Sequence, residues 1–408
     1  MPPKGARTPM VWKENRENAY CEITPAILAL KEQWEKKNYI DPKLYKEYNV
    51  KRGLRDEDGR GVLTGLTRVG EIQSYSVTEG EHIIPQDGML YYRGIDCREL
   101  VKGSEGRLFA FEETAYLLLF GELPTAAQLE AFCRQLASYR TLPTNFFRDV
   151  IMKAPPRDLM NTMQRGILTL FCYDDKPNDI GLENVLRQCL QLMSNMPVLA
   201  IYAYQAWRFS QGESLFIHVP KPELSTAENF LRMLREDCSY TDLEARTLDV
   251  ALILHADNGG GNNSTFTNHV VTSSGTDTYS AIAASMASLK GPRHGGANSK
   301  VMAMMDDVKE HVRDWNDEGC VADYLTRILN KDAFDRSGLI YGLGHAVYTK
   351  TDPRCEVFRA YVNHLAAEKG REDELALYAN VEKIGKQLLM ERQHKSVLST
   401  NIDFYSGF

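Results

Sequence analysis

The spacing of apolar residues along the chain predicts a protein built mostly of helices. In the stretch 298–315, apolar side chains recur every three or four positions, which is the spacing of one helix face. Asn298 precedes them as a candidate N-cap. A similar stripe runs through residues 377–390. Both stretches therefore predict amphipathic helices that turn one face to the core.

A different pattern occurs earlier in the chain and predicts a small β element. Branched and aromatic residues dominate 66–77 and 88–95, and turn-forming residues bound both stretches. The chain after them is helical in pattern. One helix begins at a capping box formed by Thr241 and Glu244 and ends at His255, before a run of glycines. We therefore expect a mainly α fold with short strands or a hairpin near the N-terminus.

Composition and charge exclude several classes of function. The 408 residues carry a net charge of −7, with 48 basic and 55 acidic side chains interspersed, so nothing resembles a nucleic-acid-binding face. The apolar runs are far shorter than the roughly 20 residues that a membrane span needs, and no signal peptide is visible. The eight cysteines form no C-x-x-C pair and are expected to be reduced core residues. These features predict a cytoplasmic protein.

One histidine follows a helix that is crowded with small residues. The segment 277–291 is rich in alanine and serine and ends at a Gly-Pro stop signal, so it predicts a closely packed, rigid helix. His294 comes just after it, and Gly295 and Gly296 leave room for a ligand beside the ring. The alternative is a turn histidine that only satisfies local carbonyl groups.

Two further segments carry residues suited to acid–base chemistry. His345 follows alternating glycines in 338–354, and this stretch lacks the third glycine of a dinucleotide-binding fingerprint. Arg354 stands on a proline-constrained turn, where a guanidinium can clamp a carboxylate. Asp403 lies among apolar and aromatic neighbours, which would raise its pKa toward that of a useful base. The alternative for Asp403 is an Asx-turn beside Ser406.

Metal, covalent and phosphoryl chemistry have no support in the sequence. The histidines and aspartates of interest show no H-x₃-H, H-E-x-x-H or C-x-x-C spacing, so we predict no metal site. No G-x-S-x-G elbow and no Walker loop occur.

Several long motifs, taken together, carry a family resemblance. They are "LHADNGGGNNST" (254–265), "SLKGPRHGGANSKV" (288–301), "YGLGHAVYTKTDPR" (341–354) and "NIDFYSG" (401–407), with "YRGIDCREL" (92–100) and "FEETAYLLLFGELPT" (111–125) upstream. In order and spacing the chain resembles the citrate synthase family over roughly residues 60 to 408. Its "DFYSG" ending resembles the prokaryotic form.

The resemblance implies a two-domain, multi-helical fold and a homodimer. It divides the chain into a charged N-terminal extension (1–60), a large helical domain (61–295) and a small helical domain (296–408) that closes over the substrates. It also implies condensation of acetyl-CoA with oxaloacetate to give citrate and CoA. Acetyl-CoA is then a co-substrate, and no permanently bound cofactor is expected.

The same resemblance assigns roles to individual residues. His294 would face the thioester carbonyl, Asp403 the methyl proton and His345 the ketone of oxaloacetate. His255 and Arg354 would bind the oxygens of oxaloacetate. The residues expected to face CoA are Leu339, Ile340, Gly342 and Lys350.

Three departures from the family pattern bear on activity. Asn258 replaces a frequent histidine, and Thr349 replaces a basic residue facing CoA, for which Lys350 would compensate. The chain stops at Phe408, whereas family members continue through helices that carry further substrate-binding arginines. We therefore expect weak or no turnover. The alternatives are a 2-methylcitrate synthase that uses propionyl-CoA and a catalytically impaired homologue that binds CoA or a protein partner.

Overall fold

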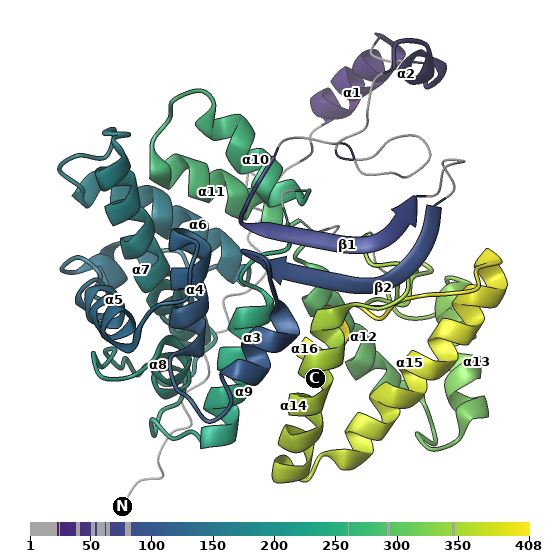
Figure 1. Ribbon diagram of the computed structural model, residues 1–408. Coiled ribbons are helices and arrows are strands. Elements are labelled where there is room, and N and C mark those ends of the chain that lie inside the picture. Colours follow the sequence, from purple (N-terminus) through teal and green to yellow (C-terminus); the bar gives the residue numbers. More distant parts are fainter. Residues whose placement is uncertain are drawn as a thin grey trace, which may run out of the picture.

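A computed structural model gives the fold of the chain (Figure 1). It describes residues 23, 25–37, 41–49, 54, 62, 66–77, 83–259, 261–291, 294–344 and 347–408. Two helices, α1 (Pro25–Lys37) and α2 (Lys43–Glu47), belong to the predicted N-terminal extension, and most of the rest of that extension lies outside the described residues.

Helices make up most of the described chain, as the apolar spacing predicts. The N-terminal half contains α3 (Cys97–Gly103), α4 (Ala110–Phe120), α5 (Ala126–Ser138), the π-helix η1 (Phe147–Ile151), α6 (Leu159–Leu170), the 3₁₀-helix η2 (Phe171–Tyr173) and α7 (Leu182–Ser210). There follow α8 (Thr226–Leu234), α9 (Asp242–Leu254), α10 (Asn263–Thr272), α11 (Thr278–Leu289), α12 (Ala297–His311), α13 (Glu318–Leu329), α14 (Pro353–Lys369), α15 (Glu372–Gln393) and α16 (Ile402–Ser406). The mainly α fold class is confirmed.

The small β element is the predicted hairpin with a short third strand. β1 (Gly70–Val77) pairs antiparallel with β2 (Ile83–Tyr92), and β3 (Ile95–Asp96) continues the sheet on the other side of β2. The register shifts between Gln73 and Tyr75, where the pairing is irregular. In Figure 1 the hairpin crosses between the group of helices α4–α8 and the group α12–α15. β2 packs on α14, and the N–H of Gly88 donates to the Thr351 hydroxyl just before that helix, so the hairpin contacts the segment that carries Arg354.

Local sequence signals account for several helix ends. The capping box of α9 is present, with Thr241 and Glu244 bonded as predicted, and His255 is the C-cap residue. The stripe predicted in 377–390 is the buried face of α15. The N-cap predicted at Asn298 is wrong, because α12 already begins at Ala297. The side-chain amide of Asn298 donates instead to the Ser406 hydroxyl at 2.8 Å, a partner more than 100 positions away.

Two main hydrophobic clusters form the core. The larger one joins residues around Tyr92 and Leu254 with residues of α12 to α16, so it draws on both predicted domains. The second packs η1, α6, α7 and α11 against one another and lies within the predicted large domain. The core is thus continuous across residue 295, and the division at 295/296 stays a prediction about movement.

The described cysteines form no disulfide bond. All seven described cysteines are unpaired, and Cys97 and Cys355 are buried. The prediction that the cysteines are core residues is wrong for Cys172, which is exposed, because it lies in η2 on the surface between α6 and α7. Within the described ranges no helix is both long and apolar enough to cross a membrane.

A buried carboxylate joins α4 to α9. Asp249 of α9 accepts hydrogen bonds from the backbone N–H groups of Ala110 and Phe111, at 3.2 and 3.0 Å, and thereby caps α4. The Asp249 residue is only 4% exposed, and both burial and the neighbouring Glu112 raise its pKa to about 6, although Arg246 lies 3.4 Å away. The native state therefore holds this proton more tightly than the unfolded chain does.

We predict that replacing Asp249 by Asn removes a pH-dependent loss of stability. The folded pKa is raised, so the penalty is absent below the unfolded pKa near 4 and develops as the pH rises to 6, reaching about 3 kcal/mol. Urea unfolding of both proteins at pH 4.5 and pH 7.5 measures it. The free energy of unfolding of Asp249→Asn should increase relative to that of the wild type as the pH rises. A difference between the two proteins that does not change with pH would contradict the prediction.

Candidate active site

His255 lies at the end of α9, where it is the C-cap residue. Its Nδ1 is 2.7 Å from the carbonyl oxygen of Ala251, so the ring is fixed by its own helix. The side chain remains accessible to solvent, yet surrounding protein atoms desolvate it and lower its pKa. Arg354 is close enough to lower this pKa further. His255 and Arg354 therefore belong to one site.

His294 lies in the turn between α11 and α12 and contacts a serine from α10. The Ser264 hydroxyl is 2.8 Å from Nε2 of His294. Desolvation lowers the pKa of His294, so the neutral ring is favoured at pH 7. The backbone N–H of His294 donates to the carbonyl of Gly291 at 2.9 Å, which holds the turn.

The glycine after His294 has a packing role. A Cβ at Gly295 would lie 2.6 Å from Leu289 Cδ1 and 2.7 Å from the Leu289 carbonyl oxygen. Because the backbone oxygen cannot move away freely, only glycine lets the turn fold this closely against the end of α11. The expected space for a ligand at this residue is therefore filled by Leu289.

Asp403 lies in α16, a helix of five residues whose N-cap is Asn401. Burial raises the pKa of the Asp403 carboxyl, and Arg354 offsets only part of that effect. The carboxylate accepts no hydrogen bond from any residue that the structure describes. The Asx-turn alternative fails, because the side chain that accepts a local backbone N–H is that of Asn401, at 3.2 Å from the nitrogen of Asp403. Asp403 is thus a partly desolvated carboxylate that is free to take a proton.

Arg354 is held in a buried ion pair with Asp352. Its Nε and Nη2 atoms donate to the two oxygens of Asp352 at 3.0 and 2.8 Å, and the residues are 5% and 1% exposed. The guanidinium also lies over the Tyr348 ring, 5.5 Å from its centroid. The second oxygen of Asp352 further accepts the backbone N–H of Ile402 at 3.2 Å. One carboxylate therefore orients both Arg354 and the start of α16.

The structure brings four of the predicted site residues into one region, and a fifth lies outside the part of the chain that it describes. α14 packs on both α9 and α16, which brings His255, Arg354 and Asp403 into one region. His294 joins them through α12, which packs on α16 and is tied to it by the bond between Asn298 and Ser406. His345 lies outside the described residues. The backbone beside it is placed, because the N–H of Gly344 donates to the carbonyl of Ser399 at 2.7 Å.

The four residues expected to face CoA differ in their surroundings. Leu339 is 54% exposed, whereas the side chain of Ile340 is buried in the core and leaves only its backbone for a ligand. Gly342 has a φ of +81°, and a Cβ there would lie 2.9 Å from Phe404 beside Asp403. Lys350 is half-exposed and forms an ion pair of 3.0 Å with Asp87 of β2.

Sequence reasoning missed two residues of this region. Ser264 gives no signal of its own, because its partner lies 30 positions away. Asp352 could have been recognised, since an aspartate directly before a proline is a strong helix N-cap, and it does cap α14. Its second partner, Ile402, could not.

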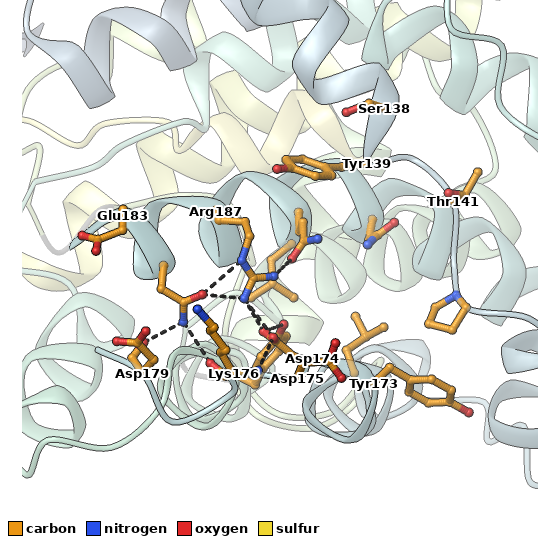
Figure 2. A pocket seen from close by; sticks show the side chains of 17 residues that line it. Ser138, Tyr139, Thr141, Tyr173, Asp174, Asp175, Lys176, Asp179, Glu183 and Arg187 are labelled. Carbon is orange, nitrogen blue, oxygen red and sulfur yellow. Dashed lines mark hydrogen bonds and ion pairs between the residues drawn. The ribbon is translucent and has the colours of Figure 1, made fainter. Parts of the chain in front are cut away.

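A separate cavity of about 640 Å³ lies away from these residues, between α5, η2, α7 and α11 (Figure 2). Figure 2 shows Arg187 directed at Asp174, which also accepts from Gln188 and from the Tyr279 hydroxyl at 2.8 Å. Burial would raise the pKa of Asp174, but these hydrogen bonds outweigh it and hold the pKa well below its usual range. The charges of Asp174 and Arg187 are thus paired with each other, and the cluster connects the end of η2 to α7 and α11.

The arrangement of the described residues suits proton transfer. Among the residues that the structure describes, no group of three or more histidine, cysteine or carboxylate side chains is placed to hold a metal ion. A neutral imidazole and a carboxylate with a raised pKa lie on adjoining elements, beside a buried guanidinium. Such a set can remove a proton from carbon and stabilise the anion that forms.

Comparisons with known proteins place the chain in a family. The family described as "Citrate synthase, C-terminal domain" matches residues 60–408. The citrate synthase of Deinococcus radiodurans is 32% identical over 324 residues, covering 79% of this chain and 78% of the relative. The crystal structure of citrate synthase from Pyrobaculum aerophilum has a TM-score of 0.68 at 29% identity, covering 86% of this chain and 81% of that one.

A third similarity concerns the fold alone. The citrate synthase of Thermoplasma acidophilum, solved as a ternary complex with carboxymethyl coenzyme A and oxaloacetate, has a TM-score of 0.69 at 22% identity. It covers 85% of this chain and 81% of that chain.

The chain belongs to the citrate synthase family and is an enzyme of the citrate synthase type.

Proposed function

We propose that the chain condenses acetyl-CoA with oxaloacetate to form citrate and CoA. The observation that carries this proposal is the Asp403 carboxylate, which has a raised pKa and accepts no hydrogen bond from the described residues. A base for a weakly acidic C–H group needs these two properties. The citrate synthase of Deinococcus radiodurans, which is 32% identical to this chain, supports the choice of reaction.

In this proposal Asp403 and His294 share the first step. Asp403 removes a proton from the methyl group of acetyl-CoA, and the electron pair of that C–H bond moves toward the thioester carbonyl oxygen. His294 donates a hydrogen bond to this oxygen as negative charge develops there. Desolvation keeps His294 neutral, so the ring donates as imidazole rather than as imidazolium.

In this proposal Ser264 orients the ring of His294. The Ser264 hydroxyl lies 2.8 Å from Nε2, and a hydroxyl can either donate or accept. The proposal assigns the donor role to the hydroxyl and the ring proton to Nδ1, because His294 must donate to the thioester oxygen.

The second substrate, oxaloacetate, is bound by other residues of the same region. His255 and Arg354 hold the carboxylates of oxaloacetate, and His345 donates to its ketone. The enolate carbon attacks the ketone carbon, the C=O π electrons move to the ketone oxygen, and a proton from His345 converts this oxygen to the hydroxyl of the product. Water then hydrolyses the citryl thioester and releases citrate and CoA. The step needs a site that closes and reopens, as the predicted small domain would allow.

CoA is held along the loop that precedes His345. Leu339 offers an exposed apolar side chain, while Ile340 and Gly342 offer backbone groups. Lys350 faces a phosphate of CoA once it leaves its exposed ion pair with Asp87. Such a pair costs little to break, about 0–1 kcal/mol.

A homodimer that pairs through α10 is part of the proposal. No residue of α10 is buried, and Val270 on this helix is 53% exposed. α10 packs mainly on α11, which in turn packs on α6. A second copy covering this face would also steady Ser264, which lies on α10. Location in the cytoplasm stays a prediction.

We predict that thiol release from acetyl-CoA depends on oxaloacetate and on Asp403. Acetyl-CoA should be preferred over propionyl-CoA by roughly 10-fold or more in kcat/KM, because one methylene is worth about 1–3 kcal/mol. Asp403→Asn, which keeps the shape but removes the base, is the control. A preference for propionyl-CoA would assign the chain to the 2-methylcitrate synthases. No release from either thioester, with oxaloacetate still bound in calorimetry, would favour an impaired binding homologue.

Ser264→Ala should lower kcat about 10- to 100-fold, because His294 loses the bond that fixes its orientation. KM for oxaloacetate should stay within about twofold, since His255 and Arg354 are untouched. Steady-state kinetics measures both. The matched control is Ser288→Ala, which removes a hydroxyl bonded to Asn263 at 2.6 Å on the same pair of helices. Equal kcat values in the two variants would exclude the role of Ser264.

Val270→Glu should convert the dimer to monomers, because it places a charge in an apolar contact. Analytical ultracentrifugation near 10 µM gives the mass. Leu108→Glu, at a residue 60% exposed between α3 and α4, is the control and should remain dimeric. A monomeric wild type would refute pairing through α10.

A further inference from the structure

The helix that carries Asp403 cannot hold its own orientation. α16 has five residues, and isolated helices shorter than about 12 residues are marginal in water. The direction of the Asp403 carboxylate is therefore imposed by contacts from other elements. A residue that contacts the chain on both sides of Asp403 would control the position of its carboxylate.

One buried carboxylate, Glu382 of α15, grips the chain on both sides of Asp403. Its Oε1 accepts the hydroxyl of Thr400 at 2.5 Å, and its Oε2 accepts the hydroxyl of Tyr405 at 2.6 Å. Thr400 precedes Asp403 by three residues, and Tyr405 follows it by two. Glu382, Thr400 and Tyr405 are 9%, 5% and 1% exposed. Water is thus largely kept from these bonds.

Two cations keep Glu382 charged in this position. Lys386 lies 2.9 Å from Oε1 and Arg359 lies 3.2 Å from Oε2. Burial alone would raise the pKa of Glu382, but the hydrogen bonds from Thr400, Tyr405 and Lys386 outweigh it and lower the pKa. Arg359 also lies over the ring of Tyr405, 5.1 Å from its centroid. The carboxylate therefore accepts both hydroxyls through charge-assisted bonds, which are stronger than neutral ones.

The other contacts of this segment each hold only one end. At its start, the N–H of Asn401 donates to the Gly342 carbonyl at 2.9 Å, and the N–H of Ile402 donates to Asp352. At its end, Ser406 accepts from Asn298, and the Tyr378 hydroxyl is 3.3 Å from the Gly407 carbonyl. Glu382 alone among these partners contacts both sides of Asp403 through one side chain.

We propose that Glu382 is a positioning residue for Asp403, holding the carboxylate in line with the carbon that it deprotonates. This inference rests on the proposed function, because it takes Asp403 as the base. Glu382 does not touch substrate. It acts by fixing two hydroxyls, and a shift of about 1 Å at a reacting group can cost about 100-fold in rate.

Glu382→Gln tests the proposal with little change of shape. The amide has a single acceptor oxygen and no charge, so it cannot serve both hydroxyls as the carboxylate does. We expect kcat to fall about 10- to 100-fold, while KM for oxaloacetate stays within about twofold. Calorimetry with oxaloacetate gives the fraction of competent sites, so loss of folded protein is not mistaken for slow turnover.

Glu318→Gln is the matched control. Glu318 lies in α13 and forms an exposed ion pair of 2.6 Å with Lys383 of α15, the residue next to Glu382. The variant therefore removes a carboxylate near Glu382 that forms no hydrogen bond with the described residues 400–407. Its kcat should equal that of the wild type. If Glu382→Gln matches this control in kcat, or changes KM and not kcat, the positioning role is wrong.

A double-mutant cycle separates positioning from general stability. Tyr405→Phe removes one of the two hydroxyls that Glu382 holds, so it should lower kcat in the same way but less. The double variant should be little slower than Glu382→Gln alone, because both changes break the same contact. Losses of kcat that multiply in full would show that the two residues act independently and would overturn the proposal.

Hydrogen exchange tests the contact without relying on turnover. In Glu382→Gln, exchange at the backbone N–H groups of residues 400–407 should rise, while that of the neighbouring α12 stays unchanged. Unchanged exchange in 400–407 would refute the proposal even if kcat fell. A wild type that binds oxaloacetate but turns over neither thioester would contradict the proposed function, and the exchange result would still decide whether Glu382 fixes α16.

Discussion

The buried ion pair between Asp352 and Arg354 is the interaction on which the site depends. Both residues are almost inaccessible, so neither charge is stabilised by water and each needs the other. Asp352 also caps α14 and accepts the N–H of Ile402 at the start of α16. Loss of Asp352 would therefore leave a buried cation and release the segment that carries Asp403. One carboxylate therefore orients the binding group Arg354 and holds the start of the helix that carries the base.

Close backbone contacts determine how the loops around this pair meet. A Cβ at Gly88 of β2 would lie 2.3 Å from the carbonyl oxygen of Thr351, and the N–H of Gly88 donates to the Thr351 hydroxyl at 2.9 Å. A Cβ at Gly342 would lie 2.9 Å from Phe404. These glycines let the hairpin, the loop before α14 and α16 approach one another more closely than a side chain would allow. The precision of the site thus comes from packing between loops and not only from helices.

Desolvation acts on the two acid–base residues in opposite directions. It disfavours the charged form of either group, so it raises the pKa of Asp403 and lowers that of His294. A carboxylate that accepts protons more readily and an imidazole that stays neutral are what enolate formation requires. The same effect at Asp249, where no chemistry is proposed, adds only a dependence of stability on pH. Burial alone therefore does not identify a catalytic residue, because a catalytic role also requires a position next to the substrate.

The sequence by itself determined the features that depend on near neighbours. The stripe of α15, the capping box of α9 and the β1–β2 hairpin follow from residues within a few positions of one another, because helix and strand periodicity are local. The motifs also led to the family. The orientation of His294 by Ser264, of α16 by Asp352 and Glu382, and the use of Asn298 as a tie to Ser406 were decided only by the tertiary structure. Each joins residues 20 or more positions apart, and which side chains meet over such a separation depends on how the helices pack.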